Sequence, residues 1–69
     1  MLMIELAAEY RYCARRIKER VKELKRRLYG VHDETEKYLL RGRIHILESM
    51  AREAEDTARY MEKYYGKGK

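Results

Sequence analysis

Residues 3–28, MIELAAEYRYCARRIKERVKELKRRL, decide the fold of this chain. Apolar or small residues recur there at alternating steps of four and three positions, and most positions between them from residue 11 onward are charged. The recurring residues are Met3, Ala7, Tyr10, Ala14, Ile17, Val21, Leu24 and Leu28. In a helix, this spacing places one apolar seam along one side. The stretch therefore predicts a long helix, about residues 3–29, that packs against a neighbour through its seam.

A second helix is predicted over about residues 33–65, because an equivalent seam follows a short break. Gly30 is suited to end the first helix in a left-handed conformation, and Asp33 with Glu36 resembles a capping box that begins the second. The second seam consists of Leu40, Ile44, Leu47, Ala51, Ala54, Ala58, Met61 and Tyr65. Such a short connection makes the helices antiparallel. Residues 1–66 are thus predicted to form one all-α helical-hairpin domain, followed by a flexible basic tail at 67–69.

The seams also predict a register. If Leu28 lies against Leu40, opposed residue numbers sum to about 68, and large residues face small ones along much of the length. One rim of the seam then carries opposite charges. The pairs expected on it are Arg11 with Glu55 and Lys18 with Glu48.

The other rim is mostly apolar, and its apolar surface continues outward on both helices. A helix that is apolar over so wide an arc is not satisfied by one neighbour, and soluble monomers seldom expose so long an apolar stripe. A two-fold dimer would bury the stripe on both copies, which predicts a homodimeric four-helix bundle, with a larger assembly left open. The expected dimer interface is Leu2, Leu6, Cys13, Leu39, Ile46, Met50, Thr57, Tyr60 and Tyr64.

Length and composition set further bounds. A chain of 69 residues buries a small fraction of its surface, and domains of this size often need disulfides, a metal or a partner. The single cysteine, Cys13, excludes an internal disulfide and is expected to be a buried thiol in a reducing compartment. The first residues make a poor signal peptide, and no apolar run reaches the length of a membrane span. We therefore expect a cytoplasmic protein without a membrane partner.

The residues that carry chemistry do not form a catalytic or metal-binding pattern. His45 and Glu48 lie one helical turn apart, but the di-iron motif runs Glu-x-x-His and Gly42 occupies the position it would need. His32 lies in the turn, and Cys13 has no histidine near it in the expected register. We therefore expect no enzyme activity, no catalytic residue, no metal and no cofactor.

Basic residues dominate the first helix, with nine from Arg11 to Arg27 against two acidic residues. Near the turn the register brings like charges together, which favours binding of an anion such as a nucleic-acid phosphate. The cluster expected there is Lys25, Arg26, Arg27, Arg41 and Arg43. Two functions follow from the sequence. The first is a small homo-oligomeric interaction or regulatory module, with a further protein partner conceivable at the tyrosine-rich end; the alternative is an RNA- or DNA-binding regulator.

Overall fold

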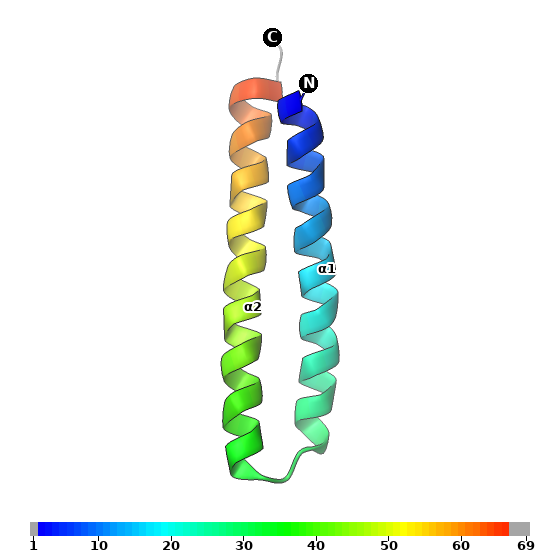
Figure 1. The fold of residues 1–69 in the computed structure, drawn as a ribbon, viewed down its shortest axis with the longest axis vertical. Helices are drawn as coiled ribbons and strands as arrows, with labels where there is room; N and C mark the ends of the chain where they lie inside the picture. Colours follow the sequence, from blue (N-terminus) through cyan, green and yellow to red (C-terminus); the bar gives the residue numbers. More distant parts are fainter. Residues whose placement is uncertain (1, 67–69) are drawn as a thin grey trace.

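The computed structural model describes residues 2–66, with side chains described for residues 5–64. It contains two α-helices, α1 (Leu2–Gly30) and α2 (Glu34–Met61), and a π-helical turn, η1 (Glu62–Gly66), that continues α2. The helices lie side by side and antiparallel, and residues 31–33 join them at one end of the rod (Figure 1). The predicted all-α helical hairpin is confirmed. The predicted tail at 67–69 lies outside the described residues.

The turn between the helices is stabilised at both sides. The Asp33 carboxylate accepts the Glu36 backbone N–H at 3.1 Å, which confirms Asp33 as the N-cap of α2. The expectation of a left-handed Gly30 is wrong: Gly30 is the last residue of α1, and its φ lies outside the left-handed region. The Val31 N–H instead donates to the Leu28 carbonyl at 3.2 Å, so a right-handed turn closes the helix.

The far end of α2 also differs from the expected single helix over 33–65. Regular α-helix ends at Met61, and residues 62–66 widen into the π-helical turn. The Glu62 N–H lies within reach of both the Ala58 and the Arg59 carbonyls, as is common where a helix changes its pitch. The chain therefore stays helical to residue 66, close to the predicted end.

The core differs between the two halves of the rod. Near the turn, the buried side chains of Val21, Leu24 and Ile44 pack with half-buried aliphatic neighbours, which are Ile17, Leu28, Leu40 and Leu47. Towards the open end, the buried side chains are alanines, namely Ala7, Ala14, Ala51 and Ala58. Because alanine fills little space, α1 and α2 approach each other through their backbones in this half. The described side chains of both predicted seams are buried or half-buried, except that of Tyr10, which is exposed; those of Met3 and Tyr65 lie outside the described residues.

The alanine half predicts an overpacking effect. Ala51 is 2% exposed at the helix contact, so Ala51→Leu has no space for its larger side chain and should lower the free energy of unfolding by about 1–3 kcal/mol. The exposed Ala8 provides the matched control, because Ala8→Leu adds the same atoms towards solvent and should change stability by less than about 0.5 kcal/mol. Urea unfolding followed by circular dichroism measures both. Equal effects of the two substitutions would contradict the close contact at Ala51.

Candidate interaction surfaces

One rim of the helix pair is a ladder of three ion pairs, which we call the ionic rim. Arg11 holds Glu62 with two hydrogen bonds, from Nε at 2.7 Å and from Nη2 at 2.8 Å. The remaining two rungs join Lys18 to Glu55 and Lys25 to Glu48, the latter at 3.1 Å between Nζ and Oε2. The rungs repeat every seven residues on both helices. An ionic rim was predicted, and the structure shows one.

The partners within this rim were predicted wrongly. Arg11 was expected near Glu55 and Lys18 near Glu48, whereas each basic residue pairs with the glutamate one heptad further along α2. Rim residues follow their seam residues by four positions on α1 and by one on α2. The residue numbers of two rim residues that face each other across the antiparallel pair therefore sum to about five more than those of two opposed seam residues, which sum to about 68. The signal was in the sequence, because glutamates stand at 48, 55 and 62.

The ladder perturbs the ionisation of its members. The hydrogen bond from Arg11 lowers the pKa of Glu62, and the hydrogen bond from Lys18 lowers the pKa of Glu55. The same contact with Glu62 raises the pKa of Arg11. These groups are open to solvent, so the rungs align the helices more than they stabilise them.

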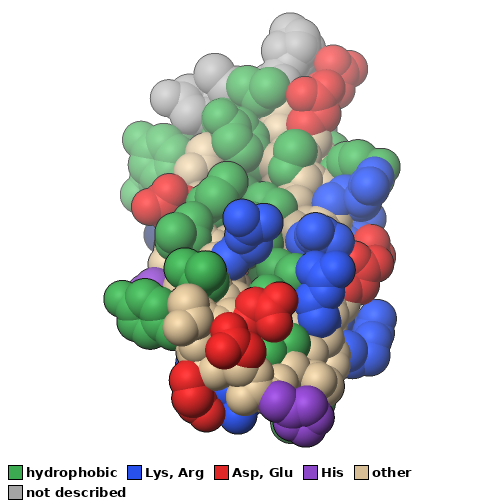
Figure 2. All heavy atoms as spheres, turned by 60° about the horizontal axis from the view of Figure 1, so that its bottom comes forward, with side chains coloured by type: hydrophobic (Ala, Val, Ile, Leu, Met, Phe, Trp, Pro, Cys, Tyr) green, Lys and Arg blue, Asp and Glu red, His purple; other side chains and the backbone are tan. Residues whose placement is uncertain are grey.

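The opposite side of the hairpin exposes a continuous apolar surface, which we call the apolar face. Figure 2 looks onto it, and apolar side chains run down the visible surface along α2 towards the turn. The exposed fraction of the residue is 63% at Leu39, 60% at Ile46 and 60% at Tyr64. The described members of the face are Leu6, Cys13, Leu39, Ile46, Met50, Thr57, Tyr60 and Tyr64; the side chain of Leu2 lies outside the described residues. Cys13 is exposed in the single chain, so the expected burial of its thiol requires a partner.

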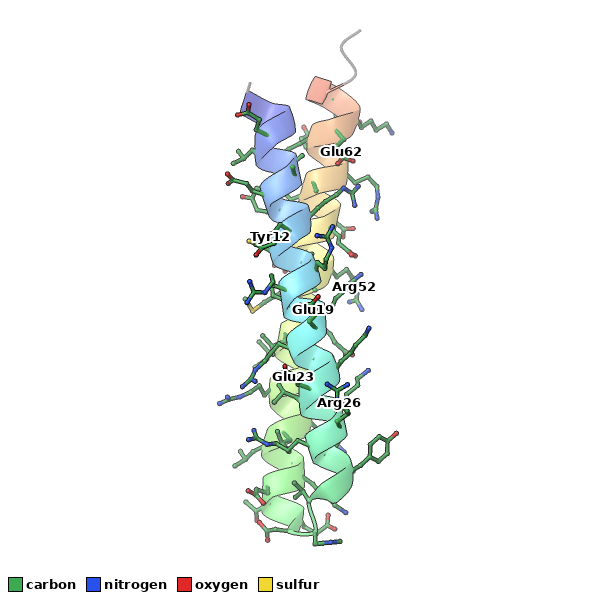
Figure 3. All side chains as sticks on the ribbon, turned by 90° about the vertical axis from the view of Figure 1, so that its right-hand side faces the viewer. Tyr12, Glu19, Glu23, Arg26, Arg52 and Glu62 are labelled. Atoms are coloured by element: carbon green, nitrogen blue, oxygen red, sulfur yellow. The ribbon has the colours of Figure 1, made fainter. Side chains whose placement is uncertain are left out.

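Two tyrosine rings contact each other at the open end of the apolar face. The rings of Tyr60 and Tyr64 lie 4.6 Å apart between centroids, tilted by 45°. On α1, Arg16 donates a hydrogen bond to the Tyr12 hydroxyl at 3.0 Å and lies 5.8 Å from the centre of that ring. Sequence reasoning did not assign the Tyr12–Arg16 pair, although its spacing of four residues on a helix predicts contact. In Figure 3, Tyr12 and Glu62 of the ionic rim project to opposite sides of the helix pair.

Near the turn, the apolar face opens into a groove. Leu39, Leu40, Ile46 and Leu47 provide its apolar lining. Four arginines and one glutamate also line it; these are Arg20, Arg27, Arg41, Arg43 and Glu36. Arg20 is paired with Glu23 at 3.0 Å. The groove therefore combines an apolar lining with a positive charge.

The predicted basic cluster is only partly assembled. Lys25 was expected to lie unpaired near Arg41, and this is wrong, because Lys25 binds Glu48 on the ionic rim. Arg27, Arg41 and Arg43 line the groove together. Arg26 lies on the surface of α1 turned away from α2 (Figure 3). Within the described residues, these four arginines have no carboxylate partner.

The groups considered for catalysis or metal binding are dispersed. His32 and His45 are exposed, and Glu48 beside His45 is held by Lys25. Among the described residues, no three His, Cys, Asp or Glu side chains gather closely enough to hold a metal ion. Over residues 2–66, neither helix has a stretch long and apolar enough to cross a bilayer.

The lowered pKa values of Glu55 and Glu62 predict an acid-sensitive ladder. A carboxyl whose pKa is lower in the folded state stabilises the fold above its unfolded pKa, about 4.3, and this contribution is lost as the pH falls through the folded value. Between about pH 5 and pH 3, the double variant Glu55→Gln/Glu62→Gln should therefore lose less stability than the parent chain. Glu19→Gln, at an exposed position turned away from α2 (Figure 3), is the control and should follow the parent. Urea titrations at each pH measure the effect, and identical pH profiles for all three proteins would contradict it.

Comparisons of the chain with protein-family models, curated proteins and solved structures found no match. Inferences about function therefore rest on the surfaces of the hairpin itself. Two features of the described residues carry these inferences: the exposed apolar side chains of the apolar face, and the groove arginines Arg27, Arg41 and Arg43, which have no carboxylate partner among those residues.

Proposed function

We propose that the chain is a non-catalytic interaction module that pairs with a second copy through the apolar face and forms a four-helix bundle. The observation that carries this proposal is the row of large apolar side chains left in solvent on one side of the rod. Its most exposed members on α2 are Leu39, Ile46 and Tyr60. A two-fold contact would cover the same row on both copies at once.

The dimensions of the hairpin support a partner of its own size. The chain exposes 5593 Å², against about 4600 Å² for a compact monomer of the same mass. The difference, about 1000 Å², is close to the ~800 Å² that each partner buries in a standard interface. The radius of gyration of the Cα atoms is 15.7 Å, against about 11 Å for a compact domain of this length. A second hairpin would convert this thin rod into a bundle with an interior.

The chemistry of the apolar face also fits a protein contact. Tyrosine, methionine and arginine are enriched at interfaces, and the face provides Tyr60, Tyr64 and Met50, with arginines around its groove. A reducing compartment such as the cytoplasm suits the exposed thiol of Cys13, which the second copy would cover. The module would then act in regulation or assembly, presenting its outer surfaces only as a pair.

This proposal predicts that Ile46→Glu disrupts association. A glutamate at the centre of the apolar face would lose its solvation in the dimer, so the variant should have the mass of one chain where the parent has the mass of two. It should also melt at a lower temperature, since folding and pairing are linked. Tyr29→Glu is the matched control, because Tyr29 is 90% exposed and lies outside the apolar face. Light scattering and thermal melts at several concentrations provide the measurements.

Two results would contradict the proposal. One is a parent chain that is folded with the mass of a single chain at about 100 μM, a concentration at which even a weak dimer of about 10 μM Kd is mostly assembled. The other is an Ile46→Glu variant that still pairs as tightly as the parent.

A second candidate function is binding of RNA or DNA. It is supported by the arginines Arg26, Arg27, Arg41 and Arg43, which lack a carboxylate partner within the described residues. Phosphate oxygens would supply that partner, and release of counterions would drive the binding. Arg26 lies on the surface of α1 turned away from α2 and would remain available to nucleic acid in a dimer (Figure 3). Arg41 lines the groove, but it also lies beside Lys25 and Glu48 of the ionic rim, which the dimer leaves open.

Binding to nucleic acid predicts a steep dependence on salt. Gel shifts with mixed RNA and DNA fragments should show a complex at about 50 mM salt that weakens by an order of magnitude or more at about 200 mM. Arg26→Glu/Arg41→Glu should abolish the complex, whereas Lys22→Glu/Lys63→Glu, an equal change of charge at exposed positions elsewhere, should only weaken it. Absence of a complex at low salt would remove this candidate.

A further inference from the structure

We propose that the second copy docks antiparallel to the first, so that the arginine groove near the turn of each copy receives the tyrosine-rich open end of the other. This inference rests on the proposed pairing through the apolar face and adds its orientation. It follows from the uneven distribution of charge and aromatic rings along that face.

The end of the face near the turn is positive. Arg27 and Arg43 stand at the same level on α1 and α2, and both line the groove. Neither has a carboxylate partner within residues 5–64. Glu36, the one acidic residue of the groove, is outnumbered there by arginines.

The open end of the face has the complementary groups. Glu9 lies on α1 beside Leu6, is exposed, and has no ion pair among the described residues. Tyr60 near the end of α2 and Tyr64 in η1 present their rings there, both more than half exposed. Glutamate and tyrosine rings are the two surfaces that a guanidinium favours, through an ion pair and a cation–π contact.

Two orientations would bury the face with two-fold symmetry, and they differ in which charges meet. If both turns lay at the same end, α1 of each copy would face α2 of the other. Arg27 would then lie against Arg43 of the partner subunit, and four guanidiniums would gather at one level. Like charges opposed in this way disfavour an interface. In this orientation Glu9 also has no arginine of the partner subunit opposite it.

In the antiparallel orientation, α1 faces α1 and α2 faces α2. With the two-fold axis at the middle of the rod, beside Met50, Arg27 comes opposite Glu9 of the partner subunit. On α2, Arg43 comes opposite Tyr60 of the partner subunit, and Leu39 opposite Tyr64 of the partner subunit. Each contact occurs twice. Either orientation would cover the apolar face on both copies, so the charges at its two ends decide between them.

Charge reversal tests the orientation, because Arg27→Glu should weaken pairing in the antiparallel dimer and strengthen it in a dimer with both turns at the same end. In the antiparallel dimer, Arg27→Glu places two glutamates together at each end, so the dimer dissociation constant should rise by about tenfold or more at low salt. Glu9→Arg should do the same by opposing two arginines. The combination Arg27→Glu/Glu9→Arg should restore tight pairing, since it exchanges the charges. Positions 9 and 27 are about 27 Å apart along α1, so this rescue reports a contact between copies. Sedimentation equilibrium provides the constants.

The outcomes distinguish failure of the antiparallel orientation from failure of the proposed pairing through the apolar face. A parent chain that never pairs removes both. A parent that pairs, but whose Arg27→Glu variant pairs more tightly or equally well, retains the dimer and overturns the antiparallel orientation. Failure of the double variant to recover has the same meaning.

Crosslinking gives an independent measurement that does not depend on charge. In a Cys13→Ser background, Leu39→Cys and Tyr64→Cys variants are treated with a bismaleimide of about 10 Å span. The antiparallel dimer should crosslink a mixture of the two variants and neither variant alone, because equivalent thiols at position 39 would be about 35–40 Å apart. Crosslinking of Leu39→Cys to itself, without crosslinking in the mixture, would overturn the inference.

Discussion

Two helices can touch along only one line, and this geometric constraint governs the molecule. The contact between α1 and α2 buries little more than the seam residues, and in the open half these are alanines with almost no side chain to bury. Close backbone approach at Ala14 and Ala51 brings the helices together but supplies little apolar area. The hairpin is therefore a well-defined shape with a small core, and the apolar face represents the surface that this core cannot enclose.

The two sides of the seam serve different purposes because of this constraint. The ionic rim is satisfied within one chain, since each of its three basic residues has a glutamate across the helix contact. The apolar face is instead left exposed, and the charged groups beside it stand at opposite ends of the rod. Charges that pair inside the chain fix how α1 lies on α2. Charges that have no such partner among the described residues, such as Arg27 and Glu9, would select the orientation of the proposed second copy.

Much of the fold could be predicted because helices encode their contacts in spacing. The seams identified both helices to within a few residues, and Asp33 with Glu36 located the turn correctly. The partners on the ionic rim could not be obtained by extending the seam register, because rim positions are offset differently from the seam on the two helices. Gly30 was misread because its residue type permits a left-handed end without requiring one. The candidate surfaces were predicted as sets of residues, but Arg26 is separated from Arg43 on α2 because it lies on the surface of α1 turned away from that helix.

The contrast between the two halves of the core also has a consequence for how the chain acquires its structure. The bulky aliphatic cluster of Val21, Leu24 and Ile44 lies beside the short connection, where closing the loop costs least entropy. Contacts there are local and bury the most area, so collapse should start at the bend and proceed towards the termini as a zipper. The last turns to close are the alanine-lined ones, which should open transiently most often and exchange their amide hydrogens fastest.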